Sequence, residues 1–241
     1  MGEDKKLPAR RGTWQDADTA LLKGAIGSIP IVGSILSELV GLIIPDQRID
    51  RLEDFVRRLA ERLDSLDPEA LREQFRNPES VDLFEEGAVQ SVRAVSEERR
   101  EYIASIVSEG LSGDAKDRIQ AKRLLRLLSR IDDDQIIILA SYLRQNAHDD
   151  EFFERHKAVL HPVSAYLGAD QDEIDAEAMF QLARAELVQL GVLRGNFKAI
   201  KKGELPEFDN RTGMVKASGW QITSLGRLLL RQIGLAAPDD F

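Results

Sequence analysis

The apolar residues between positions 49 and 66 follow the most regular pattern in the chain. Their spacing alternates between three and four residues, at Ile49, Leu52, Val56, Leu59, Leu63 and Leu66. A helix with this spacing carries one narrow apolar seam of the coiled-coil type. Arginines, aspartates and glutamates occupy many of the positions between them. The pattern predicts a helix that packs along this seam and exposes charged faces of mixed sign.

Residues that typically cap or interrupt helices predict a series of further helices. Their expected ranges are 68–76, 79–95, 96–111, 115–131 and 133–146. The boundaries come from Asn77 before a proline, from Ser96, from Gly110 and from the acidic residues 132–134, which suit a helix N-terminus. With the seam helix, these segments predict a helical bundle domain over residues 14–146.

The pattern of the chain changes after about residue 150. We expect two short helices, one longer helix, two strands and a last helix, at about 150–160, 162–168, 173–191, 192–203, 214–223 and 224–234. One side of the longer helix carries Met179, Leu182, Ala183, Leu187 and Leu190. A helix, a two-stranded wing and a closing helix in this order resemble a winged-helix domain.

The predicted fold is therefore mainly α. It is a multi-helix bundle with an N-terminal apolar helical hairpin over 20–44 and a C-terminal winged-helix-like α+β module over 147–236. We expect residues 1–13 to be a flexible lead and residues 237–241 to be a tail.

The apolar segment 20–44 contains the sequence "GAIGSIPIVGSILSELVGLII". A continuous transmembrane helix needs about 20 apolar residues, but Lys23, Pro30 and Glu38 interrupt this run. Small residues at four-residue spacing let helices approach closely. The residues expected to matter here are Gly24, Gly27, Pro30, Gly33, Ser37 and Gly41. The hairpin is either buried in the bundle, or it leaves the bundle to enter a membrane or drive self-assembly.

Composition limits the classes of function. The chain has 241 residues, of which 43% are apolar and 31% charged, with a net charge of −9 and no cysteine. This charge opposes an overall affinity for nucleic acid or anionic lipid. The lack of cysteine excludes disulfides and thiol chemistry and fits a cytoplasmic protein. Peripheral contact with the inner membrane is the alternative location.

DNA binding is the obvious use of a winged helix. The outward face of the candidate recognition helix, however, is acidic, with Glu173, Asp175, Glu177 and Glu186. Candidate phosphate contacts in the wing region are Lys198, Lys201, Lys202, Arg211 and Lys216. We therefore place a protein-contact or structural role ahead of DNA binding.

No catalytic or cofactor motif is found in the sequence. The histidines His148, His156 and His161 are separated by eight and five residues, which does not give the i, i+4 pair of zinc metalloproteases. The chain lacks a phosphate-loop lysine motif and a GxSxG elbow. We expect no enzymatic activity, metal, cofactor or small-molecule substrate.

Three stretches carry a resemblance to a known family: "DQRIDRLEDFVRRLAERLDSL", "SVDLFEEGAVQSVRAVSEERREYIASIVSEGLS" and "LLRLLSRIDDDQIIILASYL". Their order after an apolar, glycine-bearing segment resembles the layout of bacterial helical proteins of the abortive-infection alpha family. The resemblance covers about residues 45–145 and carries over no catalytic residue. It implies a bacterial or prophage-borne cytoplasmic protein of phage defence.

The leading functional hypothesis is a non-enzymatic interaction or effector protein. It would act on a protein partner or a second copy, by self-assembly and conditional membrane contact through the apolar hairpin. The alternative is a DNA-binding regulator that uses the C-terminal module.

Overall fold

The computed structural model describes residues 48–144, 150–160, 170–200, 203, 205–208, 213 and 215–236. Several predictions concern residues outside these ranges: the lead 1–13, the apolar hairpin 20–44, the short helix 162–168 and the tail 237–241. The candidate site residues outside them are Gly24, Gly27, Pro30, Gly33, Ser37, Gly41, Lys201, Lys202 and Arg211.

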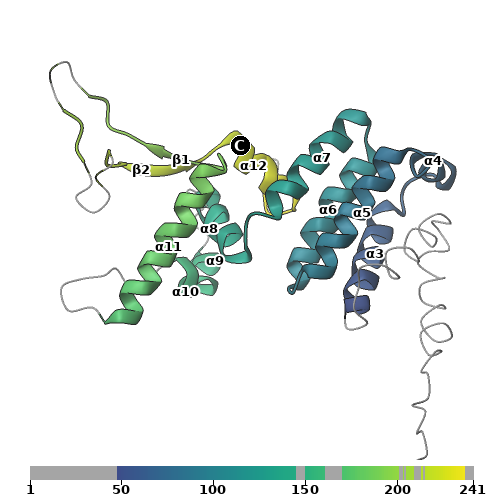
Figure 1. Cartoon of the computed structure of the whole chain (residues 1–241), viewed down its shortest axis with the longest axis horizontal. Helices are drawn as coiled ribbons and strands as arrows, with labels where there is room; N and C mark the ends of the chain where they lie inside the picture. The colour runs from purple at the N-terminus through teal and green to yellow at the C-terminus, as the bar shows by residue number, and fades with distance from the viewer. Residues whose placement is uncertain are drawn as a thin grey trace, which may run out of the picture. The chain divides into compact units, whose positions relative to one another are not determined.

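The described residues form ten helices and one two-stranded antiparallel sheet near the C-terminus (Figure 1). The mainly helical fold predicted from the sequence is thereby confirmed. The chain divides into two compact units, with the boundary between Lys122 and Arg123. This boundary lies inside a helix, whereas the sequence pattern places a domain boundary after residue 146.

The first unit contains α3 (Ile49–Leu63), α4 (Pro68–Gln74), α5 (Pro78–Arg93), α6 (Glu97–Ser112) and the start of α7 (Ala115–Leu128). Helix α3 packs against α5 and α6, and α5 also packs against α6. Figure 1 shows these three helices side by side.

Local capping explains where these helices begin. The side chain of Asp67 accepts from the Ala70 amide at 3.0 Å, and that of Asn77 accepts from the Glu79 amide at 2.9 Å. Ser96 caps α6 in the same way. Such caps satisfy amides that have no acceptor within the helix. The starts predicted at Asn77 and Ser96 are confirmed.

Aromatic rings and a glycine fill the centre of the first unit. The Phe84 ring centroid lies 5.9 Å from that of Phe55 and 5.8 Å from that of Phe75. A Cβ atom on Gly87 would lie 2.6 Å from Val107 Cγ2 and 3.2 Å from Phe55 Cζ. Only a residue without a side chain therefore lets α5 approach α6 and α3 this closely.

The second unit contains the end of α7 and the remaining elements: α8 (Asp133–Arg144), α9 (Asp150–Arg155), α10 (Lys157–Leu160), α11 (Gln171–Gln189), β1 (Leu193–Asn196), β2 (Gly219–Ile222) and α12 (Ser224–Gln232). Helix α8 is central, because it contacts α10, α11, α12 and β2. The segment expected to be one helix over 150–160 is divided into α9 and α10 by a turn at His156.

Gln135 joins the start of α8 to α11. Its backbone amide donates to Asp132 Oδ1 at 2.7 Å, and its side-chain oxygen accepts from the Asp132 amide at 2.9 Å. Its Nε2 atom donates to Glu186 Oε2 at 2.5 Å. One buried side chain thus both caps a helix and fixes its contact with another helix.

The two strands pair antiparallel, with Leu193 opposite Ile222 and Asn196 opposite Gly219. They are shorter than the strands expected from the sequence, although an isolated bridge between Phe208 and Val215 extends the pairing. We call the described residues between 193 and 222 the β hairpin; these are 193–200, 203, 205–208, 213 and 215–222.

Helix α12 begins at its N-cap Thr223, as predicted, and packs closely on the chain before β1. A Cβ atom on Gly226 would lie 2.3 Å from the carbonyl oxygen of Val192 and 2.8 Å from Ile222 Cγ1. Glycine at this position is therefore a packing requirement.

Candidate functional site

The predicted seam of α3 lies in the core of the first unit. Leu52, Val56, Leu59 and Leu63 are at most 3% exposed, while Ile49 and Leu66 are half-buried. Phe55, which is not one of the predicted seam residues, is fully buried beside them. Phe55 follows Leu52 by three residues, and this spacing places both side chains on the same side of the helix, so that the apolar stripe is wider than the seam. The seam faces α5 and α6, so it offers no surface to a partner.

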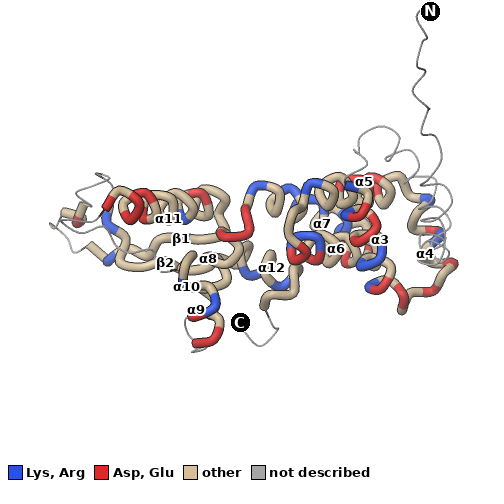
Figure 2. Tube along the Cα trace, turned by 90° about the horizontal axis from the view of Figure 1, so that it is seen from below, with Lys and Arg blue, Asp and Glu red and all other residues tan. Residues whose placement is uncertain are grey.

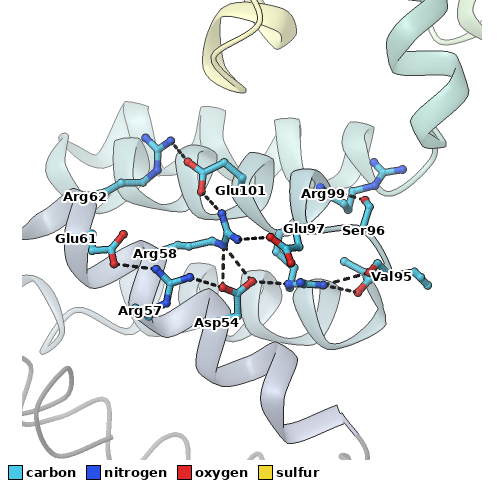
Figure 3. A network of polar contacts seen from close by, with 12 residues as sticks. Asp54, Arg57, Arg58, Glu61, Arg62, Val95, Ser96, Glu97, Arg99 and Glu101 are labelled. Carbon is cyan, nitrogen blue, oxygen red and sulfur yellow. Dashed lines mark hydrogen bonds and ion pairs between the residues drawn. The ribbon is translucent and has the colours of Figure 1, made fainter. Parts of the chain in front are cut away.

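Asp54 is the centre of an ion-pair network beside this seam (Figure 3). One of its carboxylate oxygens accepts from Arg57 Nη2 at 2.5 Å and from Arg58 Nε at 3.0 Å. The other accepts from Arg100 Nε at 2.6 Å. Burial alone would raise the pKa of Asp54, but hydrogen bonds from Arg100, Arg58 and Arg57 outweigh it and hold the pKa below its usual value.

Arg100 extends the network to the connection between α5 and α6. The residue is buried, and its Nη1 atom donates to the carbonyl oxygens of Ala94 at 3.3 Å and Val95 at 3.2 Å. Because the guanidinium group has five donors in a fixed plane, one side chain can hold two backbone acceptors and a carboxylate. Arg100 therefore fixes α3, α6 and the α5–α6 connection together.

Glu101 closes the other end of the network. It accepts from Arg58 Nη1 at 2.9 Å and also pairs with Arg62. Burial would raise the pKa of Glu101, but the hydrogen bonds from Arg62 and Arg58 lower it overall. Since the arginines of this cluster have acidic partners, the network is a structural clamp and no cationic binding surface.

The hairpin lysines predicted as phosphate contacts share an acidic partner. Lys216 Nζ lies 2.8 Å from Glu207 Oε1, and Lys198 Nζ lies 3.5 Å from Glu207 Oε2. The hydrogen bond from Lys216 is the main cause of a lowered pKa of Glu207. The structure thus brings Lys198 and Lys216 together, but with a carboxylate between them.

The candidate recognition helix α11 carries several acidic residues (Figure 2). Asp175 and Glu186 are exposed, and Glu173 and Glu177 are half-buried. The guanidinium carbon of Arg184 lies 4.5 Å from the centroid of the Trp220 ring, in a cation–π contact with β2. The helix therefore offers few free cations to a phosphate backbone.

Several apolar side chains of α11 are exposed, although the sequence pattern predicts some of them on the same side of the helix as the buried Leu187. Leu187 is buried, but Met179 is 64% exposed, Leu182 is 50% exposed and Ile174 is 40% exposed. We call Met179 and Leu182, which are three residues apart, the α11 apolar stripe. Periodicity predicts that such residues share a face of a helix, but it does not predict whether another element covers that face.

The β hairpin exposes a second set of apolar side chains: Phe197, Ile200, Leu205, Phe208 and Val215. Phe208 and Val215 are directly opposite each other, so their side chains lie on the same face of the ribbon. Exposed apolar side chains that lie side by side, as Phe208 and Val215 do, are typical of interaction sites in soluble proteins. The sequence pattern predicts cationic contacts in this hairpin, and it does not single out these apolar residues.

Within the described ranges, no group of three or more histidines, aspartates or glutamates is placed to hold a metal ion. His156 lies against the Phe152 ring, with 4.8 Å between ring centroids, while His148 and His161 are outside the described residues. None of the described helices has the length and apolar character required to cross a membrane.

Comparison with known proteins gives no match to a protein-family profile, to a curated protein or to a solved structure.

Proposed function

We propose that this chain is a non-enzymatic interaction protein that acts by self-assembly. The observation that carries the proposal is the exposure of apolar side chains on two elements of the second unit, the α11 apolar stripe and the β hairpin. Removing such side chains from water provides the main driving force for protein association, about 25 cal/mol per Å² of apolar area.

The composition of this surface supports binding to protein. Met179 has an unbranched, adaptable side chain, and Phe197 and Phe208 offer large apolar area. Methionine and aromatic residues are enriched in protein interfaces, whereas charged residues are depleted from their centres. The acidic residues of α11, among them Asp175 and Glu186, would lie at the rim of the interface.

The apolar hairpin 20–44 is the second part of the proposal. Its small residues at four-residue spacing, such as Gly33, Ser37 and Gly41, favour close helix pairing. We propose that this segment contributes to self-assembly and to conditional contact with a membrane. The resemblance to the abortive-infection alpha family supports a role in bacterial phage defence.

The assembly is tested by replacing Met179 and Leu182 together with glutamate in the full chain. Sedimentation equilibrium should show an oligomer for the original chain and a shift toward monomer for the double variant. The matched control is Gln181→Glu with Ala185→Glu, which adds the same charge to exposed positions of the same helix outside the stripe. A monomeric original chain, or equal dissociation in both double variants, would contradict the proposal.

The membrane part is tested separately with liposomes of neutral lipid, because the net charge of −9 opposes binding to anionic lipid. We expect co-sedimentation and dye leakage with the original chain, and loss of both with Gly33→Leu and Gly41→Leu. A chain that never binds lipid rules out membrane contact. If these substitutions leave the oligomer unchanged, the apolar hairpin 20–44 has no role in assembly. The Met179 and Leu182 variants test the role of α11 separately.

The phage-defence part needs a cellular measurement. Bacteria that express the chain should reduce the plating efficiency of a sensitive phage, and the Met179→Glu, Leu182→Glu double variant should restore it. Equal plating with and without the chain across a phage panel would count against this role.

DNA regulation by a winged helix is the second proposal. The order of α11, β1, β2 and α12 supports it, whereas the acidic residues on α11 and the pairing of Lys198 and Lys216 with Glu207 do not favour it. Binding to duplex DNA should then weaken steeply as salt rises, because phosphate contacts release counterions. Absence of binding at low salt would remove this alternative.

A further inference from the structure

A pocket of about 360 Å³ lies in the second unit, between the ends of the two strands and the start of α12. Its walls come from Gly191, Arg194 and the continuous segment Gln221–Leu225, together with Arg227. This volume is at the lower end of the range for small-molecule sites, about 300–1,000 Å³. The exposed apolar surface described above uses different residues.

The charge of the pocket differs in sign from that of the whole chain. Two arginines line it, and no acidic side chain does so among the described residues. The chain as a whole has a net charge of −9. Two uncompensated guanidinium groups around one hollow favour an anion, and arginine binds phosphate oxygens through paired hydrogen bonds.

Arg194 is held in place by a neutral partner. Its Nη2 and Nε atoms donate to Gln221 Oε1 at 2.7 Å and 3.3 Å. Gln221 is the residue directly opposite Arg194 in the strand pair. The pairing orients the guanidinium group without neutralising its charge.

Arg227 lines the same pocket from α12. Its Nε atom is buried and has no hydrogen-bond partner within the part of the chain that the structure describes. A buried donor without an acceptor costs about 1–3 kcal/mol, so such groups in proteins are normally satisfied by the protein, by water or by a ligand. An anion in the pocket would place an acceptor beside this guanidinium group.

Ser224 and Leu225 line the pocket at the start of α12, where Thr223 fixes the backbone. Thr223 Oγ1 donates to the Gly191 carbonyl oxygen at 2.7 Å and accepts from the Gly226 amide at 3.1 Å. The amides of Ser224 and Leu225, in the first turn of α12, have no acceptor within the helix. Such amides and the helix dipole add to the attraction of the two arginines for an anion.

We propose that this pocket binds a small phosphate monoester through Arg194, Arg227 and the first amides of α12. A small ligand is favoured over a nucleic-acid strand because a strand needs a row of free cations beyond one pocket. The nearby hairpin lysines Lys198 and Lys216 already share Glu207.

The test is a titration of the ¹⁵N-labelled full chain with inorganic phosphate, and then with adenosine 5′-monophosphate, in chloride buffer. The Ser224 and Leu225 amide signals should shift and saturate with both probes. Arg194→Gln and Arg227→Gln should each weaken binding about tenfold, as expected for loss of one charge-assisted contact. Arg231→Gln removes the same charge from α12 but does not line the pocket, so it should leave the affinity unchanged.

A lack of saturable shifts at Ser224 and Leu225 would overturn the proposal. So would an Arg194→Gln, Arg227→Gln double variant that binds phosphate as tightly as the original chain. If Arg227→Gln does not fold, judged by circular dichroism, the exposed Arg194 provides the deciding variant. Tighter binding of a duplex oligonucleotide than of phosphate at these two amides, at equal phosphate concentration, would also overturn it, because the occupant would then be a polymer.

Discussion

Arg100 Nε donates to Asp54 Oδ2 across 2.6 Å and thereby joins α6 to α3, although the two residues are 46 positions apart. Asp54 accepts from Arg57 and Arg58 as well, so its carboxylate holds guanidinium groups from both helices. The contact is partly buried, which reduces the screening that weakens exposed ion pairs.

Asp54→Asn should destabilise the first unit by about 2 kcal/mol, because it leaves the buried Arg100 without its charged acceptor. Urea unfolding followed by circular dichroism measures this change. Glu61→Gln serves as the control, since Glu61 is exposed and pairs with Arg57 on the same helix. The control should cost less than about 0.5 kcal/mol. Equal costs for the two variants would show that the network adds little to stability.

Acid should weaken the first unit through the same carboxylates. The pKa values of Asp54 and Glu101 are lowered in the folded chain, so the unfolded chain takes up their protons at higher pH. Their contribution is therefore complete above the unfolded values of about 4 and is lost as pH falls through the folded values. Urea unfolding at a series of pH values should show the original chain and Asp54→Asn converging in stability below about pH 4. A constant difference at all pH values would contradict this assignment.

Gly226→Ala should destabilise the second unit by about 2 kcal/mol, because the new Cβ would overlap the Val192 carbonyl oxygen. Gly219→Ala is the matched control, since a Cβ atom there meets nothing within 4 Å. Hydrogen exchange of peptides from β1 and β2 reports the local effect. Faster exchange is expected in the first variant alone, and unchanged exchange there would mean that α12 shifts without cost.

Leu59→Ala should destabilise the first unit by about 3 kcal/mol, because Leu59 is 1% exposed and its removal leaves a cavity. Leu205→Ala changes a side chain that is 88% exposed, so its effect on unfolding should stay within about 0.5 kcal/mol. Thermal or urea unfolding distinguishes the two. Similar small effects would show that the α3 seam packs loosely.

Helix starts were predictable because their signals are local. Asn77, Ser96 and Thr223 accept hydrogen bonds from amides two or three residues later in the chain, and these pairs can be recognised without knowing the fold. The hairpin of β1 and β2 was also placed in the correct part of the chain, but its regular pairing is shorter. Strand ends depend on partners on the other strand, which lie more than 20 residues away.

The candidate site was less predictable, because the type of a residue does not show which side chains it pairs with in the folded chain. Lys198 and Lys216 were predicted as phosphate contacts, yet only the fold shows that Glu207 lies between them. The sequence does not single out Arg194 and Arg227, because 33 positions separate them and neither belongs to a known motif. The pocket that they share exists only when β1 and α12 come together.

By itself, the sequence determined the helical character of the chain, the caps of its helices and the seam of α3, because turns and periodicity depend on residues a few positions apart. The tertiary structure decided which apolar faces are covered: Leu59 is buried, whereas Met179 and Leu182 are exposed. It also decided which charges are paired, as for Asp54 and Arg100, and which line a pocket, as for Arg194 and Arg227. Burial and pairing depend on elements far apart in the chain, and periodicity does not carry that information.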